Sequence, residues 1–258
     1  MFDEGGIGYE IVKALPASPK PYHVLLGSRS LDCGHQAAAQ LRSELPSTAN
    51  TVEPLQLDLL SDAPIEAAFS AVQSANRRLD VLINNAGLTR DLNVLRGTAT
   101  LRASLTDSYA VNVAGTHVVS STFVPLLLRS TDPRLIFISR LGTFASATKR
   151  GYPVPATLGR GTWPKSEVTF ETLGYRCSKT AMNMLMLNYR RKLEVDGVKV
   201  WAVLPGFLET DLGGERELAR EMGAGHPRLG GEVVRRVVEG ERDGEPGWLI
   251  NKDGIVEF

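Results

Sequence analysis

The stretch Val81-Leu82-Ile83-Asn84-Asn85-Ala86-Gly87 joins a short apolar run to a polar turn. Its apolar part is too short for a helix and favours a buried strand. Paired amides beside alanine and glycine let the chain turn sharply directly after that strand. One interpretation is that this cluster forms a turn and has no further role. Its place after a buried strand favours a loop that faces a ligand, and Asn85, Ala86 and Gly87 are candidate cofactor-binding residues.

Similar apolar runs recur along the chain and alternate with helical patterns. The further predicted strands are 23–26, 51–57, 135–138, 199–203 and, more weakly, 248–250. The predicted helices are 8–15, 34–45, 64–76, 105–128 and 175–194. The strands do not alternate strictly between apolar and polar residues, as expected when helices cover both faces of a sheet. The order predicts an α/β domain with parallel strands joined by helical crossovers.

The composition is that of an ordinary globular protein. The chain has 258 residues, 43% of them hydrophobic and 22% charged, which suits one large α/β domain spanning residues 1–258, although length alone would also permit two small domains. Its 29 basic and 29 acidic residues cancel, so nothing suggests binding to nucleic acid or to an anionic membrane.

The cellular setting follows from the cysteines and the apolar stretches. With two cysteines the chain has no disulfide framework, which indicates the reducing cytoplasm. The apolar stretch 118–128 is too short and too polar to cross a bilayer, and the acidic, glycine-rich first residues do not resemble a signal peptide. We expect a soluble cytoplasmic protein.

Residues 143–172 do not fit the alternating pattern. They contain several prolines and glycines and no periodic segment, and such long irregular stretches are often functional. Loops at the carboxyl ends of parallel strands bind ligands, so this insertion is expected to form a wall or lid on the substrate side. Tyr152, Trp163 and Phe170 suggest an aromatic or aliphatic lining, or they simply pack the loop.

The start of the chain offers a phosphate site. Gly5-Gly6-Ile7-Gly8 precedes a helical pattern, and glycines at a helix start let the backbone approach a pyrophosphate. Gly6, Ile7 and Gly8 are therefore candidate cofactor-binding residues, although a flexible tail explains the glycines equally well.

The residues after two predicted strands suggest which dinucleotide binds. Ser28 and Arg29 follow strand 23–26, where a carboxylate would bind the ribose of NAD and an arginine accommodates the 2′-phosphate of NADP. The alternative is a solvated surface arginine. Asp58, followed by Leu59, comes after strand 51–57 and is suited to accept from an adenine amino group, or it caps a helix or closes a turn.

Tyr175 and Lys179 are four residues apart in a predicted helix and share one of its faces. A free tyrosine has a pKa of roughly 10, and a nearby ammonium is expected to lower it, giving a general acid for a carbonyl oxygen. Ser139, at the end of strand 135–138, is placed to donate to the same oxygen. Such a Tyr–Lys pair also occurs by chance, so its weight comes from its order with Asn112 and Ser139.

These residues belong to a longer ordered series. It comprises Gly6-Ile7-Gly8, Asn85-Ala86-Gly87, Asn112-Val113-x-Gly115, Ser139-x-x-Gly142, Tyr175-x-x-x-Lys179, and Pro205-Gly206 with Thr210. The set covers nearly the whole chain and resembles the short-chain dehydrogenase/reductase superfamily. The resemblance implies a single Rossmann-type domain with a doubly wound parallel sheet that binds NADP(H), and no metal site is expected.

The resemblance also implies individual roles. Tyr175 is then the catalytic acid or base, and Lys179 also binds the nicotinamide ribose. Ser139 orients the substrate, and Asn112 helps to hold a proton-relay water.

The later part of the chain matches subgroups of the family. Pro205, Gly206, Leu208 and Thr210 match the segment that contacts the nicotinamide side. The segment 206–212 and the tail 248–254 are similar to fungal members of secondary metabolism. The long stretch before the tyrosine is similar to carbonyl-reductase-like relatives. The superfamily resemblance also implies a homodimer or homotetramer, since many of its members form one.

The family motif departs from this sequence at its start. The motif begins with Thr-Gly after a buried first strand, and these positions fall here on Met1 and Phe2, so the first strand is expected to be absent. Either the start of the coding sequence is misplaced or the gene model truncated, or the chain is a weakened or inactive descendant. We favour the first explanation because the candidate site residues are all retained, namely Ser139, Tyr175, Lys179 and Arg29.

The predicted activity is NADPH-dependent interconversion of a ketone or aldehyde and an alcohol on a small organic molecule, with Tyr175 as acid or base. The alternative is a truncated, catalytically impaired dinucleotide-binding or scaffold protein. A third, weaker candidate is an isomerase or dehydratase, because a fold does not determine a reaction.

Overall fold

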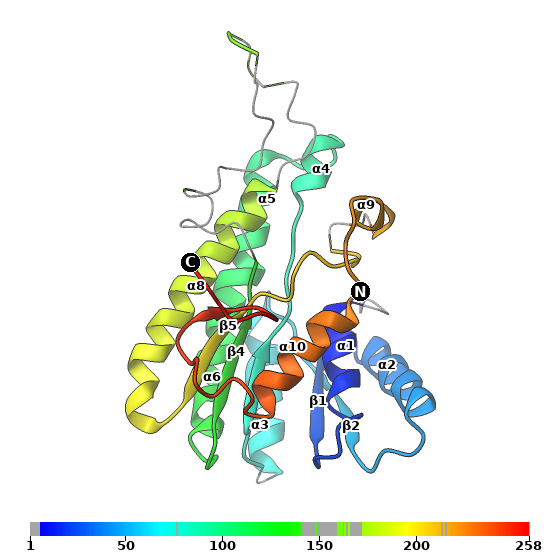
Figure 1. Ribbon diagram of the computed structural model, residues 1–258, viewed down its shortest axis with the longest axis vertical. Coiled ribbons are helices and arrows are strands. Elements are labelled where there is room, and N and C mark those ends of the chain that lie inside the picture. The colour runs from blue at the N-terminus through cyan, green and yellow to red at the C-terminus, as the bar shows by residue number, and fades with distance from the viewer. Residues whose placement is uncertain are drawn as a thin grey trace.

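A computed structural model of the protein describes residues 6–75, 77–140, 148, 159–161, 163, 165, 172–212, 214 and 216–257. Its helices and strands follow one another in the order α1 Ile7–Ala14, β1 His23–Ser28, α2 Leu31–Glu44, β2 Thr51–Gln56, α3 Asp62–Ser74, β3 Val81–Asn84, α4 Asp91–Leu95, α5 Leu101–Tyr109, the π-helix η1 Ala110–Gly115, α6 Thr116–Leu127, β4 Arg134–Ile138, α8 Leu173–Leu193, the 3-10 helix η2 Glu194–Asp196, β5 Lys199–Val203, α9 Arg216–Glu221, α10 Arg228–Val238, β6 Leu249–Ile250 and β7 Ile255–Val256. Figure 1 shows strands flanked by helices, so the predicted α/β fold with parallel strands is confirmed.

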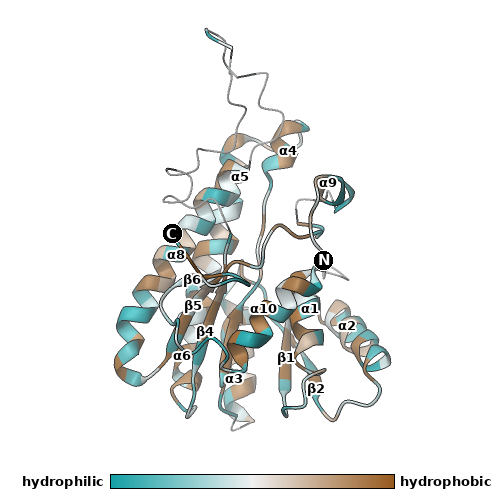
Figure 2. Ribbon diagram, viewed as in Figure 1, coloured by the Kyte–Doolittle hydropathy of each residue, from teal (hydrophilic) through white to brown (hydrophobic). Residues whose placement is uncertain are grey.

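The core is built from strands that are apolar on both faces. Every residue of β4 is buried, and Figure 2 shows hydrophobic residues concentrated along β4 and β5. Leu135 and Phe137 of β4 pack with α8, whereas Ile136 and Ile138 pack with α1 and α10. This two-sided burial explains why the strand showed no polar alternation in the sequence.

Helix 105–128, which the sequence predicts as one segment, is instead α5, η1 and α6 in succession. The turn at η1 is a π-helix, and the continuous helix Leu101–Leu127 has the length and hydropathy of a membrane span. Phe123, Leu126 and Leu127 are nevertheless buried inside the protein, as in the core helix of a globular domain.

Several elements were not predicted: α4, α9, α10 and β7. Helix α10 contains two glycines in its first turn and four valines after them, residues of low helix propensity. It forms because Val233, Val234 and Val237 lie on one face and are buried against the sheet.

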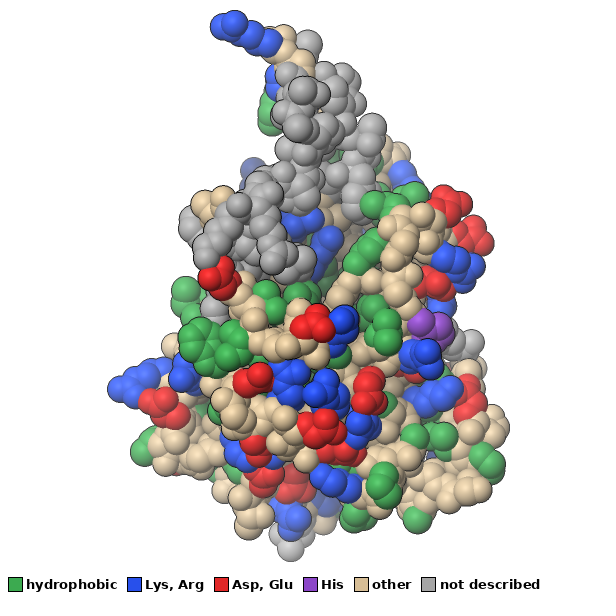
Figure 3. All heavy atoms as spheres, in the orientation of Figure 1, with side chains coloured by type: hydrophobic (Ala, Val, Ile, Leu, Met, Phe, Trp, Pro, Cys, Tyr) green, Lys and Arg blue, Asp and Glu red, His purple; other side chains and the backbone are tan. Residues whose placement is uncertain are grey.

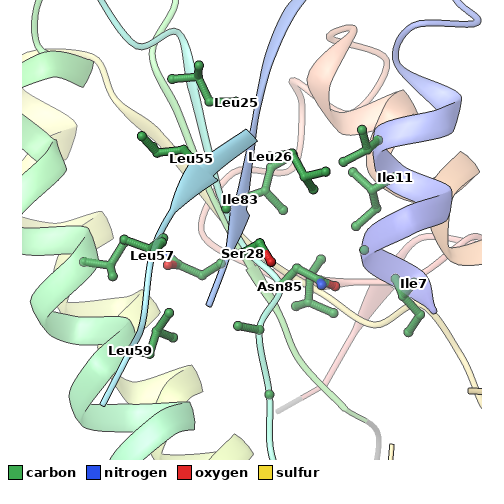
Figure 4. A pocket seen from close by; sticks show the side chains of 18 of the residues that line it. Ile7, Ile11, Leu25, Leu26, Ser28, Leu55, Leu57, Leu59, Ile83 and Asn85 are labelled. Carbon is green, nitrogen blue, oxygen red and sulfur yellow. The ribbon is translucent and has the colours of Figure 1, made fainter. Parts of the chain in front are cut away.

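The strands form two separate parallel groups. β1 pairs with β2, and the second sheet has the order β3-β4-β5-β6-β7, in which β7 is antiparallel. Within the described part of the chain no strand lies between β1 and β3, so each of them has one unpaired edge. A cleft of ≈ 2380 Å³ runs between them, and apolar side chains such as Leu26, Leu57 and Ile11 lie along it (Figure 4).

Helix α1 connects the two strand groups. Ile11 and Leu15 pack into the core of the larger sheet, whereas Tyr9 and Val12 pack with β1 and α2. On the outer side α1 lies against α10, and a β-carbon added at Gly231 would stand 2.5 Å from the carbonyl oxygen of Glu10. This close approach of two helix backbones therefore requires glycine at position 231.

The substitution Gly231→Val is expected to separate α1 from α10 and to lower the free energy of unfolding by about 1–3 kcal/mol, because the obstructing atoms are backbone and cannot rotate away. Urea unfolding followed by circular dichroism measures this loss. Gly244→Ala is the matched control, since a β-carbon there meets nothing within 4 Å. Equal stability of Gly231→Val and the wild type would contradict the packing role of Gly231.

Candidate active site

One face of α8 carries the candidate catalytic groups. Tyr175, Lys179 and Asn183 follow one another at intervals of one helical turn, and the last two are 2% and 4% exposed. Met182 and Met186, both fully buried, anchor the helix on β4 and β5. The apolar side of α8 thus sets the direction in which its polar groups point.

Lys179 reaches the end of β4. Its Nζ donates to the carbonyl oxygen of Ile138 at 2.7 Å and lies 5.7 Å from the centre of the Tyr175 ring. Burial lowers the pKa of Lys179 to about 7. The ammonium form is therefore favoured only below neutral pH.

Tyr175 differs from its predicted behaviour. The sequence predicts that Lys179 lowers its pKa, whereas burial raises the pKa of Tyr175 to about 12, against a smaller opposing effect of the Arg140 guanidinium. Although Tyr175 lines the cleft, the surrounding protein desolvates it, and the effect of this on the pKa outweighs that of the Arg140 guanidinium. Arg140 lies 5.3 Å from the ring centre. The hydroxyl is consequently protonated at neutral pH, as a proton donor requires.

Asp91, which was not predicted, fixes the first turn of α8. Its Oδ1 accepts from the backbone nitrogen of Gly174 at 3.0 Å, and its Oδ2 from that of Tyr175 at 3.0 Å. The hydroxyls of Ser104 and Thr89 donate to the same carboxylate at 2.9 and 3.0 Å. A carboxylate at a helix start satisfies free amides and interacts favourably with the helix dipole. Asp91 therefore positions Tyr175 through its backbone.

Ser139 is at the end of β4, as predicted, and its hydroxyl contacts α8. The backbone nitrogen of Ser139 donates to Val203 at 2.7 Å, and its Oγ donates to Oδ1 of Asn183 at 2.6 Å. The side chain is 4% exposed and is not among the residues that line the cleft. Its predicted donation to a substrate oxygen therefore requires a change of partner.

Asn112 lies in the π-helix η1 and is fully buried. Its Oδ1 accepts from the backbone nitrogen of Leu88 at 2.7 Å, while its Nδ2 donates to the carbonyl of Leu88 and to Oγ of Ser178 at 2.9 and 2.8 Å. Asn112 thus ties the loop after β3 to α8. A β-carbon at Gly87 would lie 3.6 Å from both Asn112 Oδ1 and Lys179 Nζ, so these groups are neighbours.

The cleft unites most of the predicted cofactor-binding residues. Its lining includes Gly6, Ile7, Gly8, Ser28, Arg29, Asp58, Leu59, Asn85, Ala86, Gly87, Tyr175, Lys179 and Thr210. Pro205, Gly206 and Leu208 are not part of the lining. Leu208 is buried next to Gly225 and Gly230.

The cleft is lined by the start of α1 and by the loop after β3. A β-carbon at Gly8 would stand 2.5 Å from Nδ2 of Asn85, so helix and loop are in direct contact. Arg29 is exposed at the end of β1, and no described residue forms an ion pair with it. Tyr175 and Lys179 line the same cleft. The cleft thus has a glycine-flanked helix start, an exposed arginine and a buried lysine on its walls.

The side chains of Ser28 and Asp58, which line the cleft, form hydrogen bonds to backbone atoms two residues further along the chain. Oγ of Ser28 donates to the carbonyl of Ser30 at 2.8 Å, and Oδ1 of Asp58 accepts from the backbone nitrogen of Leu60 at 3.0 Å. Asp58 therefore closes a turn, which was one of the alternatives left open by the sequence, while still lining the cleft.

Comparison with known proteins identifies the family. A family model described as short chain dehydrogenase matches residues 3–152. The chain belongs to this family. It is 42% identical over 257 residues to the short-chain dehydrogenase/reductase tropE of Talaromyces stipitatus (98% of this chain, 93% of the relative), and 41% identical over 252 residues to eupG of Phoma sp. (94% and 89%).

Solved structures share the fold of this short-chain dehydrogenase. The NADPH-bound carbonyl reductase from chicken fatty liver superimposes with a TM-score of 0.74 at 23% identity, covering 98% of this chain and 94% of that one. The carbonyl reductase Sniffer of D. melanogaster gives 0.69 at 20% identity, covering 97% and 94%. The predicted resemblance is confirmed, and the protein is an oxidoreductase of a family that acts on small molecules with a nicotinamide dinucleotide.

The predicted substrate-side insertion lies mostly outside the described residues. Gly142, Tyr152 and Phe170 belong to that part of the chain. Trp163 is described and is 87% exposed, so it does not line the cleft.

Removing the Asp91 carboxylate is expected to loosen the start of α8. Asp91→Ala leaves buried amides and hydroxyls without their acceptor, so the free energy of unfolding should fall by about 2–4 kcal/mol. Turnover should also fall, because Tyr175 loses the contact that positions its backbone. Urea unfolding and steady-state kinetics measure the two effects.

Asp107→Ala is the matched control, because Asp107 forms an exposed ion pair with Arg90, worth about 0–1 kcal/mol. If Asp91→Ala were as mild as this control, the carboxylate would not position α8.

Proposed function

We propose that the protein is an NADP(H)-dependent reductase that interconverts a ketone or aldehyde and an alcohol on a small organic molecule. The observation that carries the proposal is the single cleft that joins Arg29, at the end of β1, to Tyr175 and Lys179 on α8. The fungal relatives and the NADPH-bound carbonyl reductase of the same fold support it.

When bound, NADPH supplies the hydride for the carbonyl carbon. Tyr175, whose pKa of about 12 keeps it protonated, gives its proton to the carbonyl oxygen. The phenolate left behind is stabilised by the Arg140 guanidinium, 5.3 Å from the ring centre, and by Lys179, 5.7 Å from it, in the ammonium form that prevails below neutral pH. Ser139 holds the substrate oxygen, and Asn112 supports return of the proton to Tyr175 from solvent.

We assign the preference for NADPH over NADH to Arg29. A guanidinium binds a phosphate monoester through parallel charged hydrogen bonds, whereas a ribose diol offers it little. Because Arg29 has no carboxylate partner among the described residues, it does not have to leave an ion pair before it binds phosphate.

The unpaired edges of β1 and β3 favour a second candidate, a dinucleotide-binding or scaffold protein without turnover, since the cleft lacks the backbone that a strand between them would provide. Stopped-flow measurement of NADPH oxidation with a panel of ketones and aldehydes separates the two. Binding of NADPH without oxidation by any carbonyl compound would favour the second candidate.

Tyr175→Phe tests the proposed acid. The variant keeps the ring but loses the proton, so turnover should fall by roughly 10²- to 10⁴-fold, while the Kd for NADPH in a calorimetric titration stays within about twofold of the wild type. Tyr109→Phe, a change on α5 outside the cleft lining, is the control. Retained turnover in Tyr175→Phe would remove Tyr175 from the mechanism.

Arg29→Ala tests the cofactor assignment. The Kd for NADPH should rise at least about tenfold, since a hydrogen bond to a charged group is worth about 1.5–3 kcal/mol, and the Kd for NADH should not change. Arg42→Ala, an exposed arginine on α2, is the control. An equal loss of affinity for both dinucleotides would contradict recognition of the 2′-phosphate.

A further inference from the structure

Asn183 is a buried amide that the proposed mechanism does not use. It lies on α8 one turn beyond Lys179 and is 4% exposed. Its Oδ1 accepts the hydroxyl hydrogen of Ser139 at 2.6 Å, while its Nδ2 is buried and donates to no partner among the described residues. A buried donor without an acceptor costs about 1–3 kcal/mol, so an amide in this state is poised to rearrange.

The two ends of an amide exchange places by a half-turn about the last side-chain bond. After this turn Nδ2 of Asn183 points at Ser139 Oγ and donates to it. A hydroxyl has one hydrogen to donate, so the two arrangements differ in what Ser139 can do. In the first arrangement its hydrogen is held by Asn183, and in the second it is free for another acceptor.

A substrate oxygen changes the balance between these arrangements. Without it, either arrangement makes one hydrogen bond between Asn183 and Ser139. With a carbonyl oxygen beside Ser139, the turned arrangement makes two in series, from Asn183 to Ser139 and from Ser139 to the substrate. Hydrogen bonds in such a chain strengthen one another.

Asn183 lies beside the end of β4, next to Lys179 and on the helix that carries Tyr175. Lys179 and Asn183 contact consecutive residues at the end of β4, Lys179 through the carbonyl of Ile138 and Asn183 through the hydroxyl of Ser139. The same helix face carries Tyr175. Proton donor, cation and amide therefore keep a fixed order along α8.

We infer that Asn183 is a positioning residue that turns its amide during catalysis, donating from Nδ2 to Ser139 Oγ so that the Ser139 hydroxyl is presented to the substrate oxygen. The inference rests on the proposed carbonyl chemistry and adds a residue to it.

Asn183→Asp is the decisive variant, because an ionised carboxylate has the same shape but accepts only. It holds the Ser139 hydrogen permanently, so kcat should fall by roughly 10- to 100-fold with the Kd for NADPH within about twofold. Burial raises the pKa of an introduced carboxyl group, and its protonated form donates again. Activity of the variant relative to the wild type should therefore recover as the pH is lowered.

Asn183→Ala removes both the donor and the acceptor and leaves Ser139 free to rotate, so its loss of kcat should be smaller than that of Asn183→Asp. Asn188→Asp, at an exposed position of the same helix, is the matched control and should leave kcat unchanged. In a Ser139→Ala background, Asn183→Asp should have no further effect on kcat. An undiminished effect in that background, or a wild-type kcat in Asn183→Ala, would overturn the inference.

A readout without turnover separates this inference from the proposed function. The side-chain amide signal of Asn183 in ¹⁵N NMR spectra, assigned by its loss in Asn183→Asp, should shift when acetophenone is added to the NADP⁺-loaded protein and not in Ser139→Ala. An unmoved signal would overturn the role of Asn183. Absence of NADPH oxidation with every carbonyl compound, with the shift retained, would instead refute the proposed activity alone.

Discussion

The hydrogen bond from Lys179 Nζ to the carbonyl oxygen of Ile138 is the contact on which the site depends. It joins the middle of α8 to the last residue of β4, and the methionines on the apolar side of α8 hold the helix against the same sheet. Asp91 fixes the first turn of α8 from outside the sheet. With its start and middle both held, the helix can place Tyr175 and Asn183 at set distances from the strand end. The positions of the polar groups therefore follow from how an otherwise apolar interface is packed.

Burial affects the charge states of Tyr175 and Lys179 more than neighbouring charged groups do. Tyr175 and Lys179 have their pKa values shifted to about 12 and about 7, each in the direction that disfavours the charged form. Both shifts have the same cause, removal of water by the surrounding protein. The site therefore keeps Tyr175 protonated at neutral pH. Elsewhere the surface is balanced, with basic and acidic side chains interspersed on the face shown in Figure 3.

Local patterns in the sequence were sufficient for strands β1 to β6 and for placing Tyr175 and Lys179 on one helix face, but not for β7. Strand β5 has the predicted limits, because a short apolar run between turn signals has few other structures open to it. The role of Asp91 could not be predicted, because Asp91 caps a helix 83 residues further along the chain and no local pattern encodes that contact. Asn183 lacked a signal for the same reason: its partner Ser139 comes from a strand 44 residues away. The direction of the Tyr175 pKa shift was predicted wrongly because the spacing of residues reveals a neighbouring charge but not the extent of burial.

The division of the strands into two groups gives helix α1 an unusual position. Its two faces pack into different cores, and the described strands on either side exchange no backbone hydrogen bonds. Packing on α6 also joins the two groups, because Val119 and Phe123 lie in a cluster that contacts Leu25 of β1 and Leu82 of β3. Side-chain packing on α1 and α6, rather than a backbone ladder, therefore sets the width of the cleft between the two groups.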